Sequence, residues 1–527
     1  MTLSRTQFLF RQVQPRTQLF LLCGLVLVCT GLARSDARLA VEQAADLVQQ
    51  GQLEQAEAKA RVALSDSGTR AAANSVLGTI RYQQKRFSES VAFFQEAIRL
   101  EPRLIGAHLT LGQIYSVQGK SDLAAKMYRQ VLALDSSNVP ARIFLASLES
   151  STGHYRESLE VASPVQKQLK ASPEGVLILS EDYLKTGDRS SAIELAKNWG
   201  TFANVPAELS TRFAVLLARG GVWPEAIDIL EQAKEDGSPS YDLVFNLAGI
   251  YALNNDSEHA LENYDLALKI QSDSVPALHQ AAIIAEQRGE LERALSYWLR
   301  AKKLQPQEPE ILLGFGRVCL KMDLLEDAEP ALTEAASLRR DNTAYQYALA
   351  SAKVGKKQFE AAQAILEKVV EKEPENSQFQ YALGSVFYLE GKLAEAATHL
   401  SNSVRLQPQQ LASYYYQALI ARDQSRDSDA IQILEKLRQQ YPDHAPSCEL
   451  LGELLMSAHR YEEAETNLEK AVQLNPKSVK GNYQLGLLLS RMGKKQEADR
   501  QLAIAKSLRT EDEAASRLQL RLLDPDQ

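Results

Sequence analysis

Small and large apolar residues recur along this chain with a constant period of 34 residues, from Ala37 to Asp512. The period divides this stretch into fourteen repeats without an insertion or a deletion. The eighth place of every repeat holds Gly, Ala or Ser, and the twentieth place holds Ala or Ser. Two antiparallel helices approach closely only where the facing side chains are small. Each repeat is therefore predicted to be a helix–turn–helix hairpin with one small contact residue on each helix.

Larger apolar residues stand beside the small ones. The seventh place is Leu or Phe in eleven of the fourteen repeats, and aromatic residues occupy the twenty-fourth place in Phe94, Tyr128, Tyr264 and Trp298. An apolar face of this size cannot be buried inside one hairpin, so neighbouring repeats must stack on each other. A stack also suits a chain of 527 residues, because single compact cores stop growing at about 250–300 residues.

Glycines and prolines fall at the places where such hairpins turn and end. Prolines close second helices, as at Pro102 and Pro306, or open first helices, as at Pro140, where a missing N–H group costs nothing. Glycines stand at the expected turn between the two helices, where they adopt a left-handed conformation easily. These turn glycines are Gly51, Gly119, Gly153, Gly187, Gly221, Gly289, Gly391 and Gly493.

The third repeat carries almost the complete signature of a known family, in Leu111, Gly112, Tyr115, Ala124 and Tyr128. This pattern resembles the tetratricopeptide repeat. The resemblance implies an all-α fold, a right-handed superhelical solenoid of fourteen tandem repeats over residues 37–512. Residues 513–527, with Leu518 and Leu522 one turn apart, are predicted to form a C-terminal capping helix.

The first 36 residues differ from the repeats. Arg5, Arg11 and Arg16 precede an uncharged apolar stretch from Leu19 to Ala33. This order is typical of a secretory signal, and the stretch is shorter than the ~20 residues that a membrane-spanning helix needs. A cleaved signal peptide and an uncleaved signal anchor both remain open. In either case the protein is expected to be exported: periplasmic or secreted, or held at the membrane by its N-terminal segment.

Charge and chemical motifs argue against several functions. The net charge of -8 offers no basic surface for phosphates, so nucleic acid is not an expected partner. The seven histidines never have the spacing of paired metal ligands, and the chain has no C-x-x-C pair, nucleophile elbow or P-loop. Cys319 and Cys448 lie nearly four repeats apart, too far for a disulfide. The sequence therefore predicts a protein that is not an enzyme and that has no metal and no cofactor.

A binding surface is the more plausible functional feature, because stacked repeats form an extended concave surface lined by the first helix of each repeat. The resemblance implies that this face is read at the second, fifth, ninth and twelfth places. Aromatic phenols offer rigid contact area with hydrogen-bonding tips, and Arg317 and Arg422 could meet carboxylates. The alternative is that the tyrosines pack against the next helix and the arginines are solvated. The candidate tyrosines are Tyr347, Tyr381, Tyr388, Tyr415, Tyr416 and Tyr483.

We therefore expect a non-catalytic scaffold that binds segments of protein partners, whose identity the sequence does not give, in its concave groove. The alternative is an accessory subunit of an envelope polysaccharide synthesis or export machine, with tyrosines stacking on sugar rings. A glycosyltransferase of the kind that carries similar repeats before a catalytic domain is not expected, because only fifteen residues follow the last repeat.

Overall fold

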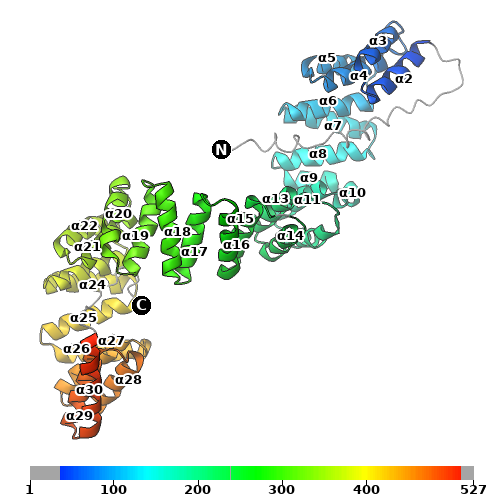
Figure 1. The fold of residues 1–527 in the computed structure, drawn as a ribbon. Helices are drawn as coiled ribbons and strands as arrows, with labels where there is room; N and C mark the ends of the chain where they lie inside the picture. The colour runs from blue at the N-terminus through cyan, green and yellow to red at the C-terminus, as the bar shows by residue number, and fades with distance from the viewer. Residues whose placement is uncertain (1–35, 238, 512–527) are drawn as a thin grey trace. The chain divides into compact units, whose positions relative to one another are not determined.

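The computed structural model of the protein describes residues 36–237 and 239–511. The predicted signal segment 1–36, apart from Asp36, lies outside the described residues, as does the predicted cap 513–527. The described residues form helices joined by turns, with no strand among them (Figure 1). The all-α prediction is confirmed. The chain divides into an N-terminal unit, Met1–Asn263, and a C-terminal unit, Tyr264–Gln527.

Each predicted repeat supplies a first and a second helix to a stack. In the N-terminal unit the pairs are α2 (Asp36–Gln49) with α3 (Leu53–Ala63), α4 (Arg70–Gln83) with α5 (Phe87–Leu100), α6 (Ile105–Val117) with α7 (Ser121–Leu134), α8 (Val139–Ser151) with α9 (Tyr155–Ala162), α11 (Pro173–Thr186) with α12 (Arg189–Lys197), α13 (Ala207–Arg219) with α14 (Trp223–Glu235), and α15 (Tyr241–Leu253) with α16 (Ser257–Ile270), whose end lies in the C-terminal unit.

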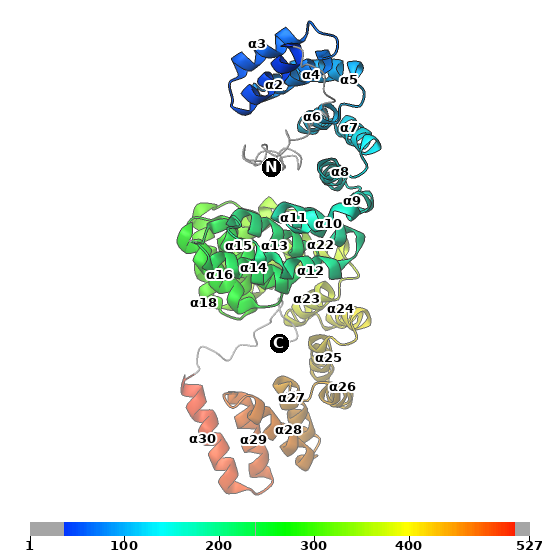
Figure 2. The same ribbon diagram turned by 90° about the vertical axis from the view of Figure 1, so that its right-hand side faces the viewer.

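The C-terminal unit continues in the same way. Its pairs are α17 (Val275–Gln287) with α18 (Leu291–Leu304), α19 (Pro309–Lys321) with α20 (Leu325–Leu338), α21 (Thr343–Gly355) with α22 (Phe359–Lys372), α23 (Ser377–Leu389) with α24 (Leu393–Leu406), α25 (Leu411–Asp423) with α26 (Asp427–Gln440), α27 (Ala445–Ser457) with α28 (Tyr461–Leu474), and α29 (Val479–Arg491) with α30 (Lys495–Glu511). Figure 2 shows α23 to α27 following one another as layers of such a stack.

The glycines at the eighth place touch the large side chain at the twenty-fourth place of the same repeat. A β-carbon on Gly78 would lie 3.0 Å from the Phe94 ring, and one on Gly384 would lie 2.8 Å from Leu400 Cγ. The two helices of a hairpin are therefore held together by a large residue seated on bare backbone. This contact is the physical reason for the small residues that mark the period.

The turn between the two helices has the same backbone conformation throughout. The fifteenth place of every repeat has a positive φ, near 60° to 90°. Glycine occupies eight of these places, as predicted. The other six carry residues with a β-carbon: Lys85, Asn255, Asp323, Lys357, Ser425 and His459. A left-handed residue is therefore required at this turn whether or not glycine supplies it.

The fourth and fifth pairs depart from the regular pattern. Helix α9 ends at Ala162, and a 3-10 turn, η2 (Ser163–Val165), leads into the short helix α10 (Gln166–Lys170). Helix α12 is followed by a second 3-10 turn, η3 (Trp199–Thr201). Trp199 is buried there, with its ring centroid 4.3 Å from that of Phe213. The second helices of these two repeats are thus interrupted.

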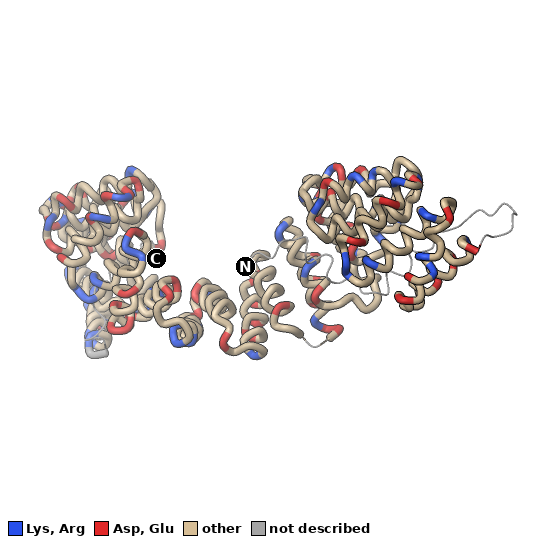
Figure 3. The backbone as a smooth tube through the Cα atoms, turned by 90° about the horizontal axis from the view of Figure 1, so that it is seen from above, with Lys and Arg blue, Asp and Glu red and all other residues tan. Residues whose placement is uncertain are grey.

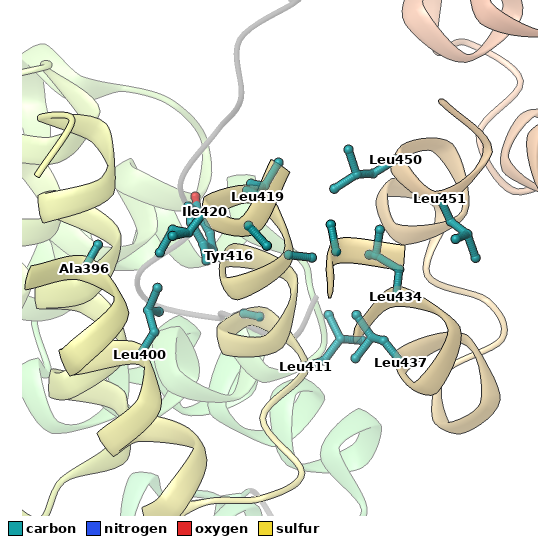
Figure 4. Packing of buried hydrophobic residues seen from close by; sticks show 14 of the residues in the cluster. Ala396, Leu400, Leu411, Tyr416, Leu419, Ile420, Leu434, Leu437, Leu450 and Leu451 are labelled. Carbon is teal, nitrogen blue, oxygen red and sulfur yellow. The ribbon is translucent and has the colours of Figure 1, made fainter. Parts of the chain in front are cut away.

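The core runs along each unit between successive layers rather than around one centre. In the C-terminal unit, Tyr416 and Ile420 of α25 lie toward Leu400 of α24, whereas Leu411 lies toward Leu437 of α26 (Figure 4). Each helix pair therefore buries its apolar surface against its neighbours, as expected of a stacked repeat.

Candidate partner-binding face

First helices of neighbouring repeats pack directly on each other within both units. These contacts join α2 with α4, α4 with α6, α11 with α13, α13 with α15, α17 with α19, α19 with α21, α23 with α25, and α27 with α29. Among second helices, α12 and α14 make a contact of similar extent. Layers that lie closer on one side curve toward that side, so the first helices line the inner face of each stack. We use "inner face" for the second, fifth, ninth and twelfth places of the first helices.

Three of the predicted binding tyrosines are buried. Tyr381 is only 2% exposed, and Tyr347 and Tyr416 are also buried in the core of the C-terminal unit. The Tyr347 ring lies 5.2 Å from that of Phe379, and the Tyr381 ring lies 6.0 Å from that of Tyr416. These rings pack between first helices of adjacent repeats, so the expected ladder of exposed phenols is interrupted at these places.

Tyr388 and Tyr415 are half-buried at the edge of the same cluster. Their rings meet that of Tyr416 edge to face, at 5.4 Å and 6.1 Å between centroids. The Tyr388 hydroxyl donates to Asp423 Oδ2 at 2.8 Å. Burial, together with this hydrogen bond to a carboxylate, raises the pKa of Tyr388 to about 12. Burial also raises the pKa of Tyr415. Both phenols are therefore neutral hydrogen-bonding groups.

Arg422 stands beside this cluster on α25. Its guanidinium forms an ion pair with Asp423, with Nη2 2.7 Å from Oδ1, and Nη2 lies 3.5 Å from the Tyr388 hydroxyl. The structure thus brings together four predicted residues, Tyr388, Tyr415, Tyr416 and Arg422. Asp423, at the thirteenth place of its repeat, completes the group and was not predicted.

Helices α27 and α29 are the first helices of the last two repeats. They carry an exposed tyrosine and a group of charged residues. Tyr483 on α29 is 49% exposed. On the same helix, Lys480 Nζ lies 2.8 Å from Glu453 Oε2 and 3.6 Å from Glu449 Oε1 of α27. Sequence reasoning did not select Glu449, Glu453 or Lys480, although all three stand at inner-face places.

Arg317 lies apart from these residues, on α19. Its Nη2 atom is 2.6 Å from Oε2 of Glu286 on α17, and Lys321 reaches the same carboxylate at 3.5 Å. The Glu286 side chain is only 5% exposed. Removing one partner of a buried pair leaves the other charge without compensation, so Arg317 joins two repeats in addition to any role toward a partner.

In residues 36–237 and 239–511, no group of three or more His, Cys, Asp or Glu side chains is arranged to hold a metal ion. No helix in these ranges is long and apolar enough to cross a membrane. Cationic and anionic residues are interspersed along the described backbone, as Figure 3 shows. The inner face of the C-terminal unit, which brings Tyr388, Tyr415, Tyr416 and Arg422 together, is the best candidate site.

Models of the tetratricopeptide repeat family match residues 41–104, 347–410 and 390–445, and a second model of this repeat matches residues 105–138 and 445–478. The matches fall in both units and agree with the helix pairs described above. These parts of the chain are therefore tetratricopeptide repeats.

Similar proteins share parts of the repeat array. The protein CTR9 homolog of Arabidopsis thaliana is 21% identical over 256 residues, which are 46% of this chain and 24% of the relative. Superkiller protein 3 of Schizosaccharomyces pombe is 28% identical over 89 residues, 17% of this chain and 6% of the relative. The human protein O-mannosyl-transferase TMTC1 is 24% identical over 115 residues, 22% of this chain and 13% of the relative. The chain thus spans a quarter or less of the length of these curated relatives.

Solved structures that align with this chain include two with TM-scores near 0.4. The APC/C hetero-tetramer Cut9-Hcn1 has a TM-score of 0.41 at 13% identity, covering 87% of this chain and 97% of the matched chain. A tetratricopeptide repeat protein from Parabacteroides merdae has a TM-score of 0.40 at 19% identity, covering 47% of this chain and 98% of its own.

Proposed function

We propose that the protein is a non-catalytic scaffold that binds an extended segment of a protein partner on the inner face of the C-terminal unit, over α23, α25, α27 and α29. The observation that carries this proposal is the exposed ring of Tyr483, three residues along α29 from Lys480, which forms an ion pair with Glu453 of α27. An aromatic ring supplies apolar contact area at a small entropic cost, and a charged rim aligns a polar backbone or side chain.

The half-buried rings of Tyr388 and Tyr415 extend this surface along the stack. Arg422 adds a cation there, and its partner Asp423 is exposed. A face that continues over several first helices suits an extended ligand, which contacts each layer in turn. Tetratricopeptide repeats, which match parts of both units, form such faces, and this supports the same proposal.

A scaffold rather than an enzyme is proposed because the groups on this face are not poised for proton transfer. Tyr388 has a pKa near 12 and that of Tyr415 is also raised, so neither is a base or a nucleophile at neutral pH. The carboxylates of Asp423 and Glu453 are engaged in ion pairs. Binding of a partner can use the phenols in their neutral form and the carboxylates within their ion pairs.

The proposal is tested by crosslinking the full-length protein in its native cells and identifying the attached peptides by mass spectrometry. Crosslinks are expected from Lys480 to a protein partner. Tyr483→Ala should then weaken binding of that partner by about tenfold or more, as for an aromatic anchor. Leu338→Ala is the matched control, because Leu338 is 48% exposed but lies on the second helix α20.

Equal loss in both variants, or unchanged binding by Tyr483→Ala, would remove this face from the proposal. Binding of envelope polysaccharide in place of protein, in a titration of the same variants, would favour the accessory role in polysaccharide synthesis or export instead.

We also propose that the protein is exported. The order of basic and apolar residues before Ala37 supports this. The N-terminal residue of the mature protein, determined by mass spectrometry after cell fractionation, separates a cleaved signal from a retained anchor. Full-length protein in the cytoplasm would contradict export.

A further inference from the structure

The N-terminal unit contains a buried carboxyl group at an irregular point of the stack. Asp182 on α11 is 0% exposed. Its Oδ2 atom lies 2.5 Å from Oγ of Ser158 on α9, in the preceding repeat. The Ser158 hydroxyl, rather than a cation, is its hydrogen-bonding neighbour, and among the described residues Oδ1 is buried without a hydrogen-bond partner. A buried carboxylate without a cationic partner is strongly disfavoured in its charged form.

The hydrogen bonds of the Ser158 hydroxyl indicate whether the Asp182 carboxyl group is protonated or ionised. Ser158 Oγ lies within hydrogen-bonding distance of two oxygens, Asp182 Oδ2 and the carbonyl oxygen of Ala146, the latter at 2.8 Å. A serine hydroxyl has one proton and donates one such bond. If Asp182 were ionised, both neighbouring oxygens would need that proton, and one would be left unsatisfied.

Another repeat shows where this proton goes. Ser90 occupies the same place in the second repeat, and its hydroxyl donates to the carbonyl oxygen of Gly78 at 2.7 Å. Gly78 and Ala146 occupy the same place in their repeats. By this comparison Ser158 donates to Ala146, and the proton between Ser158 and Asp182 belongs to the carboxyl group.

We propose that the contact between α9 and α11 is a proton-controlled junction: Asp182 is a neutral hydrogen-bond donor in the packed stack, and its ionisation loosens the stack between the fourth and fifth repeats. The proposal goes beyond partner binding, because it assigns a conformational device to the N-terminal unit. Burial raises the pKa of Asp182 from its usual value near 3.8 to about 7, and hydrogen bonding with Ser150 and Ser158 offsets part of the rise. The proton is therefore exchanged near neutral pH.

The irregular backbone explains why a change would be localised here. The second helix of the fourth repeat is broken into α9, η2 and α10. A β-carbon on Gly175, at the start of α11, would collide with the backbone of Leu169 in α10. Close packing therefore requires that α10 lies directly against α11. A helix of five residues such as α10 is less stable than a continuous second helix, so this contact is more easily lost.

The other charged groups on the surrounding helices do not compensate an ionised Asp182. Glu181, next to it on α11, has the same sign and raises its pKa further. On α8, Glu149 is paired with Arg129 and His154, and Arg142 donates to backbone carbonyls of Ser136 and Val161. Of the remaining charged residues on these helices, Arg212 is half-buried and the others are exposed. They are Arg156, Glu157 and Glu160 on α9, Lys167 and Lys170 on α10, Glu174 and Lys185 on α11, Arg189, Glu194 and Lys197 on α12, and Glu208, Arg212 and Arg219 on α13.

The direction of the pH effect follows from the raised pKa. The stabilisation is fully present below the usual pKa near 3.8 and is lost as the pH rises through about 7. Hydrogen–deuterium exchange of the full chain, normalised by intrinsic exchange rates, should show protection of α9 and α11 falling by about tenfold or more between about pH 5.5 and about pH 8. Helices in the C-terminal unit serve as an internal reference.

Two variants and one direct titration complete the test. Asp182→Asn keeps a donor but cannot ionise, so its protection should be the same at both pH values. Asp242→Asn, which neutralises an exposed acid on α15, should keep the wild-type response. If Asp182→Asn does not fold, the carboxyl carbon of Asp182 in the wild-type protein is titrated by NMR. A pKa near 7 supports the junction, whereas a pKa in the usual range for aspartate, or a wild-type protection that is independent of pH, overturns it.

Discussion

The ring of Tyr128 lies directly against the α-carbon of Gly112, so closely that a β-carbon on Gly112 would be 2.5 Å from Tyr128 Cε1. Tyr128 is buried and belongs to the core of the N-terminal unit. The same arrangement holds together the helices of other repeats, with Phe94 or leucines in place of Tyr128.

Gly112→Ala should therefore destabilise the N-terminal unit by about 2 kcal/mol, because moving a packed ring costs more than the gain in helix propensity. Gly106→Ala is the matched control in the same helix. A β-carbon at Gly106 meets nothing within 4 Å, so this change should be neutral or stabilise by up to about 1 kcal/mol. Urea denaturation followed by circular dichroism measures both. A similar effect of the two substitutions would contradict the proposed contact.

Two tyrosines at the same place of different repeats should differ strongly in how much stability is lost when each is replaced by alanine. Tyr381→Ala should lower the free energy of unfolding of the C-terminal unit by about 3–5 kcal/mol, because the side chain is packed in the core. Tyr483→Ala should change it by less than about 0.5 kcal/mol, because half of that side chain is exposed. Denaturant midpoints of the two variants decide the matter. An unchanged free energy of unfolding in Tyr381→Ala would contradict the packing role of this ring and favour the earlier expectation that it binds a partner.

The N-terminal unit should lose stability in acid through Glu57. Hydrogen bonds from Arg81 and Arg61 lower the pKa of Glu57 from near 4.5 to about 2. A lowered pKa contributes stability above its usual value, and this stability is lost as the pH falls from about 4.5 through about 2. We expect a loss of about 1 kcal/mol, since Glu57 is partly exposed to screening solvent. Comparing urea midpoints at several pH values measures it.

The matching control for this acid effect is a surface pair. Glu57→Gln should remove the corresponding part of the pH dependence, whereas Glu96→Gln should change it much less, because the Glu96–Arg99 pair is exposed and screened by solvent. Equal behaviour of the two variants would show that the buried guanidinium of Arg81 has no special role.

The turn places offer a reciprocal substitution. Lys357→Gly should stabilise the C-terminal unit, and Gly391→Lys should destabilise it, each by about 1 kcal/mol, because both residues have φ near 60° to 80°. Thermal unfolding measures both changes. A shift of the same sign in both variants would mean that contacts of the lysine, rather than the backbone, determine stability at this turn.

Much of the fold could be predicted because the same residue types recur at the same places in successive repeats, so each repeat tests what another suggests. The small residue at the eighth place and the glycine at the turn report one contact and one backbone conformation, and both are found. The break after Ala162 was missed, although Pro164, inside a second helix, was a signal that could have indicated it.

Burial of the tyrosines could not be predicted from one repeat alone. Whether a ring at the fifth place is covered depends on the next first helix. Phe379 lies on Tyr347 and Tyr416 lies on Tyr381, whereas no further first helix follows α29 in the described residues. Ion pairs such as that of Lys480 with Glu453 likewise join different repeats, so their partners are not set by the period.

The constant spacing of the repeats also bears on how genes of this kind change in length. Recombination that removes one whole repeat brings together the two repeats on either side of it. Their apolar faces are equivalent to faces that already pack on each other elsewhere in the array, so the shortened array can still bury them. The fourth repeat is one exception, because Asp182 would then face alanine at the place of Ser158, as it stands in most other repeats. That acid would have lost its only serine acceptor on α9, which makes the fourth and fifth repeats a pair that must be inherited together.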